Sequence, residues 1–533
     1  MNQMRTKALS RLTRGFLVAV LAFSSAALIA PRPAAADPVV KTDSGPVRGV
    51  TTGSIDKFLG IPYAAPPVGA LRWKAPQPAE RWHRPLDATH FANHCPQSAS
   101  PFGVASTTED CLYLNVFTPS DAHRDHGRDQ WHRIPVMVWI HGGALVVGES
   151  DDYDPTRLVE RGVVVVTINY RLGALGFLAH PALTAESPDN TSGNYGILDQ
   201  QAALEWVQRN IGAFGGDPFR VTIFGESAGG LSVHTQLASP LAAGLFQRAI
   251  VESGAYSLTQ QPLASAEAAG STYSTSVGCS DQTAACLRAV GVPTLLQHQG
   301  SGASPVVDGR VLTQSIGVAF ASGAFNQVPV LEGSNHDEWR LFVSLNGELV
   351  THTALTAAAY PGAVAATLGI PLATATFIVN TFYPLSAYAS PSLALGALGT
   401  DAIFACSGRK AIRALSQQVP TFAYEFNDEN APQNFLPPVS FPYGASHASE
   451  IQYLFEIPSA VPVLPLDGAQ RHLAETMVTY WTNFAKAANP NGAHVPFWSA
   501  YDGATDVYQS LVPPTPENET GFAGDHKCAF WTP

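Results

Sequence analysis

The feature that most constrains the fold is a series of short apolar segments, rich in β-branched residues, separated by stretches with helical periodicity. PVMVWI (135–140) and VVVVTINY (163–170) lack strict polar/apolar alternation, so we expect strands buried on both faces. Four more segments are expected to be strands: RVTIF (220–224), FQRAIVESG (246–254), VPVLEGSN (328–335) and TFAYEFN (421–427). Strands that alternate with helices indicate an α/β fold with a large, mostly parallel, twisted sheet flanked by helices.

Helices are expected between these strands and after them. GILDQQAALEWVQRNIG (196–212) has apolar residues at helical spacing, a second helix starts near Ser227, and a long one covers 467–488. The segments from about 255 to 325 and from about 345 to 400 are rich in Ala, Ser and Gln and have weaker periodicity. We expect these two segments to form helical insertions that cover the sheet and wall an active-site cleft.

The first 36 residues are typical of a secretory signal peptide. Four basic residues precede an apolar run from Gly15 to Ala30, and the small residues Ala34–Ala36 form a cleavage site. The run is short for a transmembrane anchor, and no later segment is apolar for long enough to span a bilayer. We therefore expect cleavage after Ala36, a secreted protein without stable membrane insertion, and one catalytic domain over residues 37–533.

Charge and cysteine usage limit the possible partners and cofactors. The formal net charge is −12, and no basic run follows the N-terminus, so a nucleic-acid partner is not expected. In an oxidising compartment the six cysteines indicate disulfides, although spacing does not choose among the 15 possible pairings. No C-x-x-C motif or close Cys/His grouping indicates zinc, and we expect neither a metal nor another cofactor.

The most specific chemical signal is FGESAGG (224–230), which follows an apolar strand and opens a helix. A serine hydroxyl is a weak nucleophile that needs a base and free access to its substrate. A sharp strand–turn–helix junction gives that access, and Gly225 and Gly229 relieve crowding two residues before and after Ser227. The bare G-x-S-x-G pattern also fits a structural turn, but its position after a strand favours a nucleophile.

A second motif fits acyl transfer, in which negative charge develops on a carbonyl oxygen. WIHGGAL (139–145) ends a buried strand with two glycines and an alanine, so its backbone N–H groups can turn towards the serine. Such a loop some eighty residues before the serine is much more specific than either motif alone.

Taken together, these motifs resemble the type-B carboxylesterase family, a branch of the α/β-hydrolases that includes cholinesterases and several lipases. The resemblance extends over nearly all of the mature chain. It is carried by GIPYAAPPVGALRW (60–73), EDCLYLNVFTP (109–119), WIHGGALVVG (139–148), NYGILDQQAALEWV (194–207) and VTIFGESAGG (221–230).

The resemblance implies a catalytic triad of Ser227, Glu338 and His447. GSNHDEW (333–339) resembles the family's acid motif, although Trp339 replaces its final glycine and leaves Asp337 as a neighbouring alternative. GASHASEI (444–451) resembles the histidine motif. The implied roles are a nucleophile, a base that later protonates the leaving alcohol, and a carboxylate that orients the base.

The resemblance implies further roles around the triad. The N–H groups of Gly143, Ala144 and Ala228 are expected to bind the oxyanion, while Glu226 and Glu450 orient the triad from behind. Other implied contacts are framework contacts: the disulfides Cys95–Cys111, Cys279–Cys286 and Cys406–Cys528, and the ion pairs Arg72–Glu109 and Arg171–Asp199.

The sequence thus predicts a secreted serine carboxylesterase that cleaves a small-molecule ester into an acid and an alcohol. The loop from Cys95 to Cys111 is short and contains no tryptophan, which disfavours a cholinesterase cation site and a lipase lid. We expect soluble or moderately apolar esters as substrates. The alternatives are an adhesion or binding protein with this fold, or an amidase, thioesterase or lipase.

Overall fold

The structure is a computed structural model that describes residues 37–122, 133–300, 302–458, 461 and 465–532. The described residues fall within one unit, Asp37–Pro533, which is separate from Met1–Ala36. The proposed signal peptide lies outside the described residues. No single helix of the described ranges is long and apolar enough to cross a membrane.

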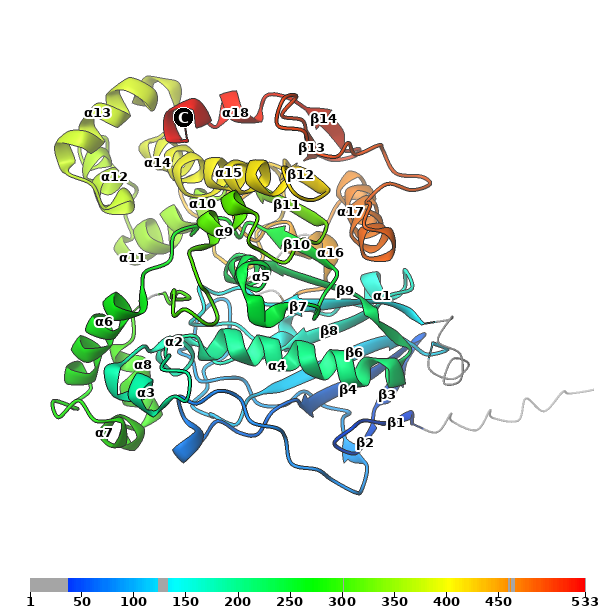
Figure 1. The fold of residues 1–533 in the computed structure, drawn as a ribbon. Helices are drawn as coiled ribbons and strands as arrows, with labels where there is room; N and C mark the ends of the chain where they lie inside the picture. Colours follow the sequence, from blue (N-terminus) through cyan, green and yellow to red (C-terminus); the bar gives the residue numbers. More distant parts are fainter. Residues whose placement is uncertain (1–36, 123–132, 301, 459–460, 462–464, 533) are drawn as a thin grey trace, which may run out of the picture. The chain divides into compact units, whose positions relative to one another are not determined.

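Within the described residues, an 11-stranded sheet forms the centre of the unit Asp37–Pro533 (Figure 1). Seven adjacent strands are parallel, in the order β8, β7, β9, β10, β11, β12, β13. They span Val164–Ile168, Ile134–Ile140, Gly216–Glu226, Arg248–Glu252, Val330–Asn335, Thr421–Phe426 and Tyr508–Leu511. The expected mostly parallel sheet is therefore confirmed.

Antiparallel strands complete both edges of this sheet. One edge adds β6 (Tyr113–Pro119), β4 (Ile55–Pro62) and β3 (Val50–Thr52), and the other adds β14 (Glu517–Glu519). A separate small sheet consists of β1, β2 and β5, at Val39–Lys41, Pro46–Arg48 and Leu86–Asp87.

Both faces of the sheet are covered because successive strand residues point to opposite sides. In β7, Val136 and Val138 belong to a core shared with α4 (Tyr195–Asn210) and α5 (Ala228–Ala238). Trp139 belongs to a second core, shared with α17 (Gly468–Ala487) on the other face. This two-sided burial explains why the central strands have no polar/apolar alternation.

The long C-terminal helix begins where the sequence predicts it. Asp467 accepts a hydrogen bond from the Gln470 N–H at 2.9 Å, and the Gln470 side chain accepts one from the Asp467 N–H at 2.9 Å. This reciprocal capping box satisfies two backbone donors that the helix would otherwise leave unpaired.

The two predicted insertions are helical, and most of their helices lie on the left side of the view in Figure 1, with α9 nearer the centre. The first contains α6, α7, α8 and α9, at Leu263–Ser276, Ala284–Ala289, Val292–His298 and Ile316–Ser322. The second contains α11, α12, α13 and α14, at Leu349–Thr351, Tyr360–Leu368, Leu372–Phe382 and Pro391–Gly399. Two π-helical segments, η6 (Ser344–Glu348) and η8 (Thr400–Ala405), flank the second insertion.

Candidate active site

Ser227 lies at the junction of β9 and α5, in a backbone conformation that side chains rarely adopt. Its φ is 55° and its ψ is −120°. A Cβ on Gly229 would come within 1.9 Å of the Ile140 carbonyl oxygen, and a Cβ on Gly225 within 2.5 Å of the same atom. This turn, residues 225–229, is called the elbow, and its close approach to β7 requires both glycines. The strained turn presents the half-buried Ser227 at its apex.

His447 and Glu338 are joined by a short hydrogen bond. His447 Nδ1 lies 2.5 Å from Glu338 Oε2, and the Glu338 side chain is fully buried. The other oxygen of Glu338 accepts hydrogen bonds from the Ser253 hydroxyl at 2.5 Å and from the Asn335 N–H at 2.8 Å. These donors stabilise an ionised carboxylate next to the imidazole.

The other ring nitrogen of His447 faces the strand end that carries Ser227. His447 Nε2 lies 3.1 Å from Oε1 of Glu226, the residue before Ser227, and has no hydrogen-bond partner among the described residues. The structure thus unites His447 with Glu338 and brings its ring to the elbow. It does not form a hydrogen bond between the ring and the Ser227 hydroxyl.

Buried carboxylates set the charge of this ring. Burial by itself lowers the pKa of His447, but the negative charges of Glu226 and Glu338 raise it to about 9. Burial raises the pKa of Glu226 well above its usual range, although His447 opposes that shift. Because these two groups are 3.1 Å apart, the charge of each one shifts the pKa of the other, and the charge of Glu338 adds to the rise in the pKa of His447.

Two further glutamates lie behind the site. Burial raises the pKa of Glu450 to about 7, and its carboxylate accepts a hydrogen bond from the Asn335 side-chain amide. Burial, together with the charge of Glu450, raises the pKa of Glu252 to about 8, and Trp481 Nε1 donates to it at 2.9 Å. The proposed orienting residues Glu226 and Glu450 thus belong to a larger buried acidic cluster.

The loop after β7 turns its backbone next to Ser227. A Cβ on Gly142 would lie 3.3 Å from the Ser227 Cβ, and φ is positive at Gly143 (94°), Ala144 (55°) and Leu145 (60°). Among the described residues, the N–H groups of Gly143 and Ala144 have no acceptor. Ala228 is the first residue of α5, so its N–H has no partner within the helix. Three donors are therefore free to bind an anion here.

Two aromatic rings from the segments that flank the second insertion contact the imidazole. Phe342 in α10 (Trp339–Val343) and Phe404 in η8 have ring centroids 5.1 Å and 5.0 Å from that of His447. Trp339 stacks on Phe342 at 4.6 Å. These rings shield the histidine with an apolar wall.

Sequence reasoning did not identify three residues that hold the acid in place. Ser253 and Asn335 donate to Glu338, and the Thr400 hydroxyl accepts from the Trp339 N–H at 3.0 Å, which caps the helix after Glu338. Ser253 and Asn335 lie at the carboxyl ends of the predicted strands 246–254 and 328–335, a position that favours site residues in parallel sheets. Thr400 is distant in sequence and carries no local signal.

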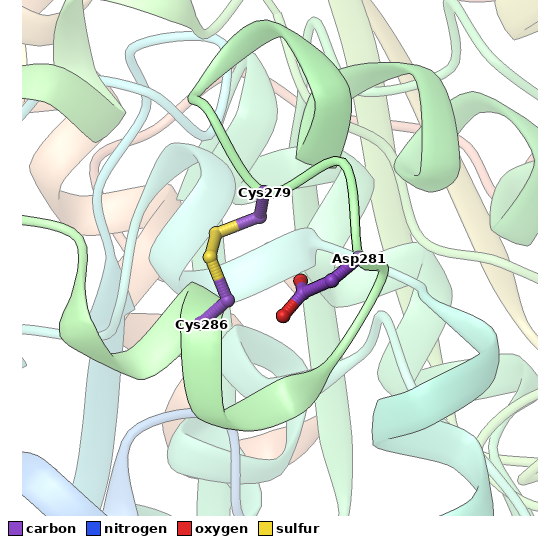
Figure 2. A group of neighbouring side chains, drawn as sticks. All are labelled: Cys279, Asp281 and Cys286. Atoms are coloured by element: carbon purple, nitrogen blue, oxygen red, sulfur yellow. A yellow bond between two sulfur atoms is a disulfide. The ribbon is translucent and has the colours of Figure 1, made fainter.

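The framework contacts implied by the resemblance are present. The disulfides are Cys95–Cys111, Cys279–Cys286 and Cys406–Cys528. Arg72 pairs with Glu109 at 2.5 Å, and Arg171 pairs with Asp199 at 2.7 Å. Figure 2 shows Asp281 beside the Cys279–Cys286 bond. The sulfurs of Cys279 and Cys286 are bonded to each other, so they are not available as thiolate ligands for a metal ion.

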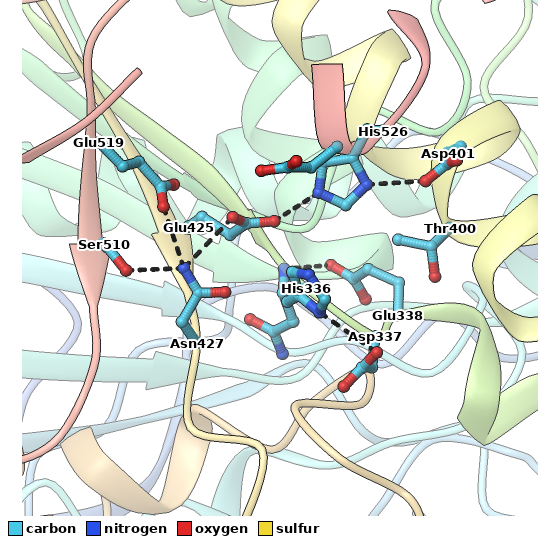
Figure 3. Close-up of polar contacts among 12 residues, drawn as sticks. His336, Asp337, Glu338, Thr400, Asp401, Glu425, Asn427, Ser510, Glu519 and His526 are labelled. Carbon is cyan, nitrogen blue, oxygen red and sulfur yellow. Dashed lines mark hydrogen bonds and ion pairs between the residues drawn. The ribbon is translucent and has the colours of Figure 1, made fainter. Parts of the chain in front are cut away.

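A second polar cluster lies around His526, near the segment from His336 to Glu338 (Figure 3). His526 Nδ1 lies 2.7 Å from Asp401 and Nε2 lies 2.5 Å from Glu425, while His336 contacts Asp337 at 3.2 Å. His336, Glu425 and His526 are close enough together to hold a metal ion. However, carboxylates engage both nitrogens of His526, and an imidazolium that donates to both accounts for this geometry without a metal.

Comparison with known proteins identifies the family. Residues 36–531 match the model of the carboxylesterase family. The chain is 36% identical over 500 residues to the para-nitrobenzyl esterase of Bacillus subtilis, covering 88% of this chain and 93% of that protein. It is 35% identical over 483 residues to the fumonisin B1 esterase of Sphingopyxis macrogoltabida, covering 87% of this chain and 85% of that protein.

Solved structures agree with the sequence comparison. One structure of a PNB esterase superposes with a TM-score of 0.76 at 32% identity, covering 92% of this chain and 98% of that chain. A thermophilic PNB esterase also gives a TM-score of 0.76 at 32% identity, with coverage of 92% and 99%. The α/β-hydrolase fold is thereby established, and the chain belongs to the carboxylesterase family of carboxylic ester hydrolases.

Proposed function

We propose that this protein is a secreted serine carboxylesterase in which Ser227, His447 and Glu338 form the catalytic triad. His447 takes the proton of the Ser227 hydroxyl as the oxygen attacks the ester carbonyl. The developing oxyanion is bound by the N–H groups of Gly143, Ala144 and Ala228. His447 then protonates the leaving alcohol, and a water molecule activated by the same ring releases the acid from Ser227.

The observation that carries this proposal is the position of His447, with one nitrogen on a buried carboxylate and the other at the serine elbow. Glu338 keeps the proton on Nδ1, which leaves Nε2 as the base. A change in the Ser227 side-chain rotamer, on substrate binding, would complete the serine–histidine hydrogen bond, since such contacts often tighten only in the substrate complex.

The direct test is Ser227→Ala, assayed with p-nitrophenyl butyrate on the full secreted protein. We expect ester turnover to fall by at least about 10³-fold with an unchanged melting temperature. A fluorophosphonate should add covalently to the wild type at Ser227, seen by peptide mass spectrometry, and not to the variant. Retention of most turnover by a folded Ser227→Ala protein would contradict the proposal.

For the substrate, we propose soluble or moderately apolar esters. The Cys95–Cys111 loop is short, and two isolated antiparallel bridges, Gln97–Ser106 and Ser100–Gly103, fold it on itself, which leaves too little chain for a mobile cover. A panel of p-nitrophenyl esters and acylcholines would test this proposal. Strong activation by an oil–water interface would indicate a lipase, and a preference for acylcholines over butyrate esters would indicate a cholinesterase.

We also propose that residues 1–36 are removed on export and that residues 37–533 act as one catalytic domain. The three disulfides support an oxidising compartment. Intact-mass measurement of the exported protein tests the proposal, with Asp37 as the expected N-terminus. A mature protein that retained the apolar segment would contradict it.

A further inference from the structure

The loop after β7, residues 141–148, carries the proposed oxyanion donors and is called the oxyanion loop. The buried side chain of Gln97, which lies outside the proposed catalytic segments, holds the end of this loop. Gln97 is 1% exposed. Its Oε1 accepts a hydrogen bond from the Gly148 N–H at 2.7 Å, and its Nε2 donates to the Gly148 carbonyl at 3.1 Å. The same Nε2 donates to Glu149 at 3.1 Å. One side-chain amide thus satisfies both backbone groups of Gly148 and fixes the direction of the chain there.

Gly148 contacts the beginning of the same loop. A Cβ on Gly148 would lie 2.4 Å from His141 Nδ1 and 2.8 Å from the Gly142 carbonyl oxygen, and its φ is 113°. The two ends of the loop therefore touch, and a displacement of Gly148 would be transmitted to Gly142. Gly142 directly precedes Gly143, the first of the free N–H donors.

The loop between these ends needs external support. Ala144 and Leu145 have positive φ values, an unfavourable conformation that persists only where the surroundings over-determine it. The Gly173 N–H donates to the Leu145 carbonyl at 2.7 Å, and the Ala303 N–H donates to the Ala144 carbonyl at 3.2 Å. Gln97 supplies the support at the third point, the end of the loop.

Gln97 is itself held on both sides by the first disulfide loop. Cys95, two residues before Gln97, forms a disulfide with Cys111. The backbone of Gln97 pairs with that of Ser106 through two hydrogen bonds of 3.0 Å. Gly103 lets this loop approach, because a Cβ there would lie 2.4 Å from Gln97 Oε1 and 2.9 Å from the Gly148 nitrogen.

We propose that Gln97 is a positioning residue for the oxyanion hole, and that the Cys95–Cys111 loop braces the hole rather than covering it. The inference rests on the proposed function. Gln97 touches no reacting atom, and it acts through Gly148 on the N–H groups of Gly143 and Ala144.

Loss of this support should affect the transition state more than substrate binding, because the full oxyanion charge exists only there. Removal of one oxyanion donor lowers kcat by roughly 10²–10³-fold in serine hydrolases. Since Gln97 orients the donors without removing one, we expect kcat to fall by roughly 10- to 100-fold, with KM changed by less than about 2-fold.

The test is Gln97→Leu, which keeps most of the side-chain volume and removes both hydrogen-bonding groups. The kcat and KM for p-nitrophenyl butyrate are measured together with the Ki of an alkyl trifluoromethyl ketone, whose adduct with serine places an oxyanion in the hole. We expect Ki to rise by the same factor by which kcat/KM falls. Titration of active sites with a fluorophosphonate normalises all rates to folded enzyme.

The matched control is Gln201→Leu. Gln201 is also buried, and its amide donates to Gln236 at 2.9 Å and to Ser239 at 3.1 Å, away from the oxyanion loop. It should lower the melting temperature without changing kcat or Ki. Gly103→Ala provides a second perturbation, since its Cβ would push the Gln97 amide off Gly148, and it should change kcat and Ki in the same direction as Gln97→Leu.

An unchanged kcat and Ki in Gln97→Leu would overturn the inference, and so would an equal loss in Gln201→Leu. A fall in kcat/KM without a rise in Ki would also overturn it, because the oxyanion contacts would then be intact. These outcomes are separate from the proposed function, which fails only if Ser227→Ala retains turnover.

Discussion

Glu338 occupies the N-cap position of α10, yet its side chain caps no helix N–H. Its two oxygens are taken by His447 on one side and by Ser253 and Asn335 on the other. The Thr400 hydroxyl accepts the helix N–H in its place. The Glu338 carboxylate therefore does not cap the helix, as an N-cap residue normally would, and both its oxygens remain available to the proposed site.

This arrangement predicts the pH dependence of Glu338→Gln. In the proposed mechanism the neutral imidazole is the base, so with a His447 pKa of about 9 we expect the wild-type kcat/KM to rise as pH increases towards 9. Removal of the negative charge destabilises the imidazolium, so the rising limb of the kcat/KM profile should move to lower pH. Because the ring also loses its orienting acceptor, kcat should fall by up to about 10⁴-fold.

The measurement is kcat/KM between pH 5 and pH 10 for the wild type and the variant. Glu332→Gln is the matched control, because Glu332 is equally buried and pairs with His234 at 3.1 Å rather than with His447. Its pH limb should match the wild type. An unshifted limb in Glu338→Gln would show that Glu338 does not set the pKa of His447.

At this scale the sequence identified the chemical groups but not their contacts. Ser227 could be proposed from its strand–turn–helix setting, because the strain of that turn depends on neighbouring residues. Glu338 and His447 came from resemblance, since nothing in local composition brings residues 109 positions apart together. The Asp337 alternative is not the one that contacts the histidine, because Asp337 instead pairs with Arg340 at 2.7 Å.

At the level of the elements, the central strands could be predicted and the edges could not. The predicted strands at 135–140, 163–170 and 421–427 match β7, β8 and β12 within two residues, because burial on both faces leaves continuous apolar runs. The strand β9 begins at Gly216, four residues before the prediction, because Asp217 and Pro218 have the character of a turn. The strand β13 and the edge strand β14 were not predicted, because both are short and β14 consists of polar residues.

The packing of α5 against β7 predicts a sharp difference between two glycine substitutions. Gly229→Ala places a Cβ 1.9 Å from the Ile140 carbonyl oxygen, so backbone must shift, and we expect a loss of about 1–3 kcal/mol in the free energy of unfolding. Ester turnover should fall with it, because the elbow moves. Urea unfolding and p-nitrophenyl butyrate hydrolysis measure the two effects.

Gly362→Ala is the comparison, since Gly362 lies in α12 with nothing within 4 Å of its added Cβ. An alanine there should raise the free energy of unfolding by about 0.5–1 kcal/mol and leave turnover unchanged. If Gly229→Ala were as well tolerated as Gly362→Ala, the elbow would not require a glycine at that position.

At the level of the whole molecule, the proposed site collects residues from successive crossovers of one sheet. Ser227 follows β9, Glu338 follows β11, and His447 lies beyond β12, so the carboxyl ends of parallel strands meet there. The alternating pattern of strands and helices predicted this architecture. The two insertions were predicted only as helical regions, without the bounds of their helices, because these segments are weakly patterned, and π-helical segments flank the second one.

The disulfides should contribute unequally to stability, because they close loops of very different length. Cys406–Cys528 spans 122 residues and Cys279–Cys286 spans 7. Loop-closure entropy in the unfolded chain then gives about 5 kcal/mol for the long loop and about 2 kcal/mol for the short one. Paired Cys→Ala variants, compared by urea unfolding, should show the larger loss for Cys406 and Cys528. Equal losses would contradict an entropic origin.

The spacing of the site along the chain also bears on how activity is regained during refolding. Because the proposed nucleophile, acid and base, Ser227, Glu338 and His447, lie up to 220 positions apart in the sequence, long loops must close before the three meet. We therefore expect catalytic competence to be a late event in refolding, reached after helical signals have recovered. In this chain we expect the first turnover of a refolding molecule only once its sheet is complete.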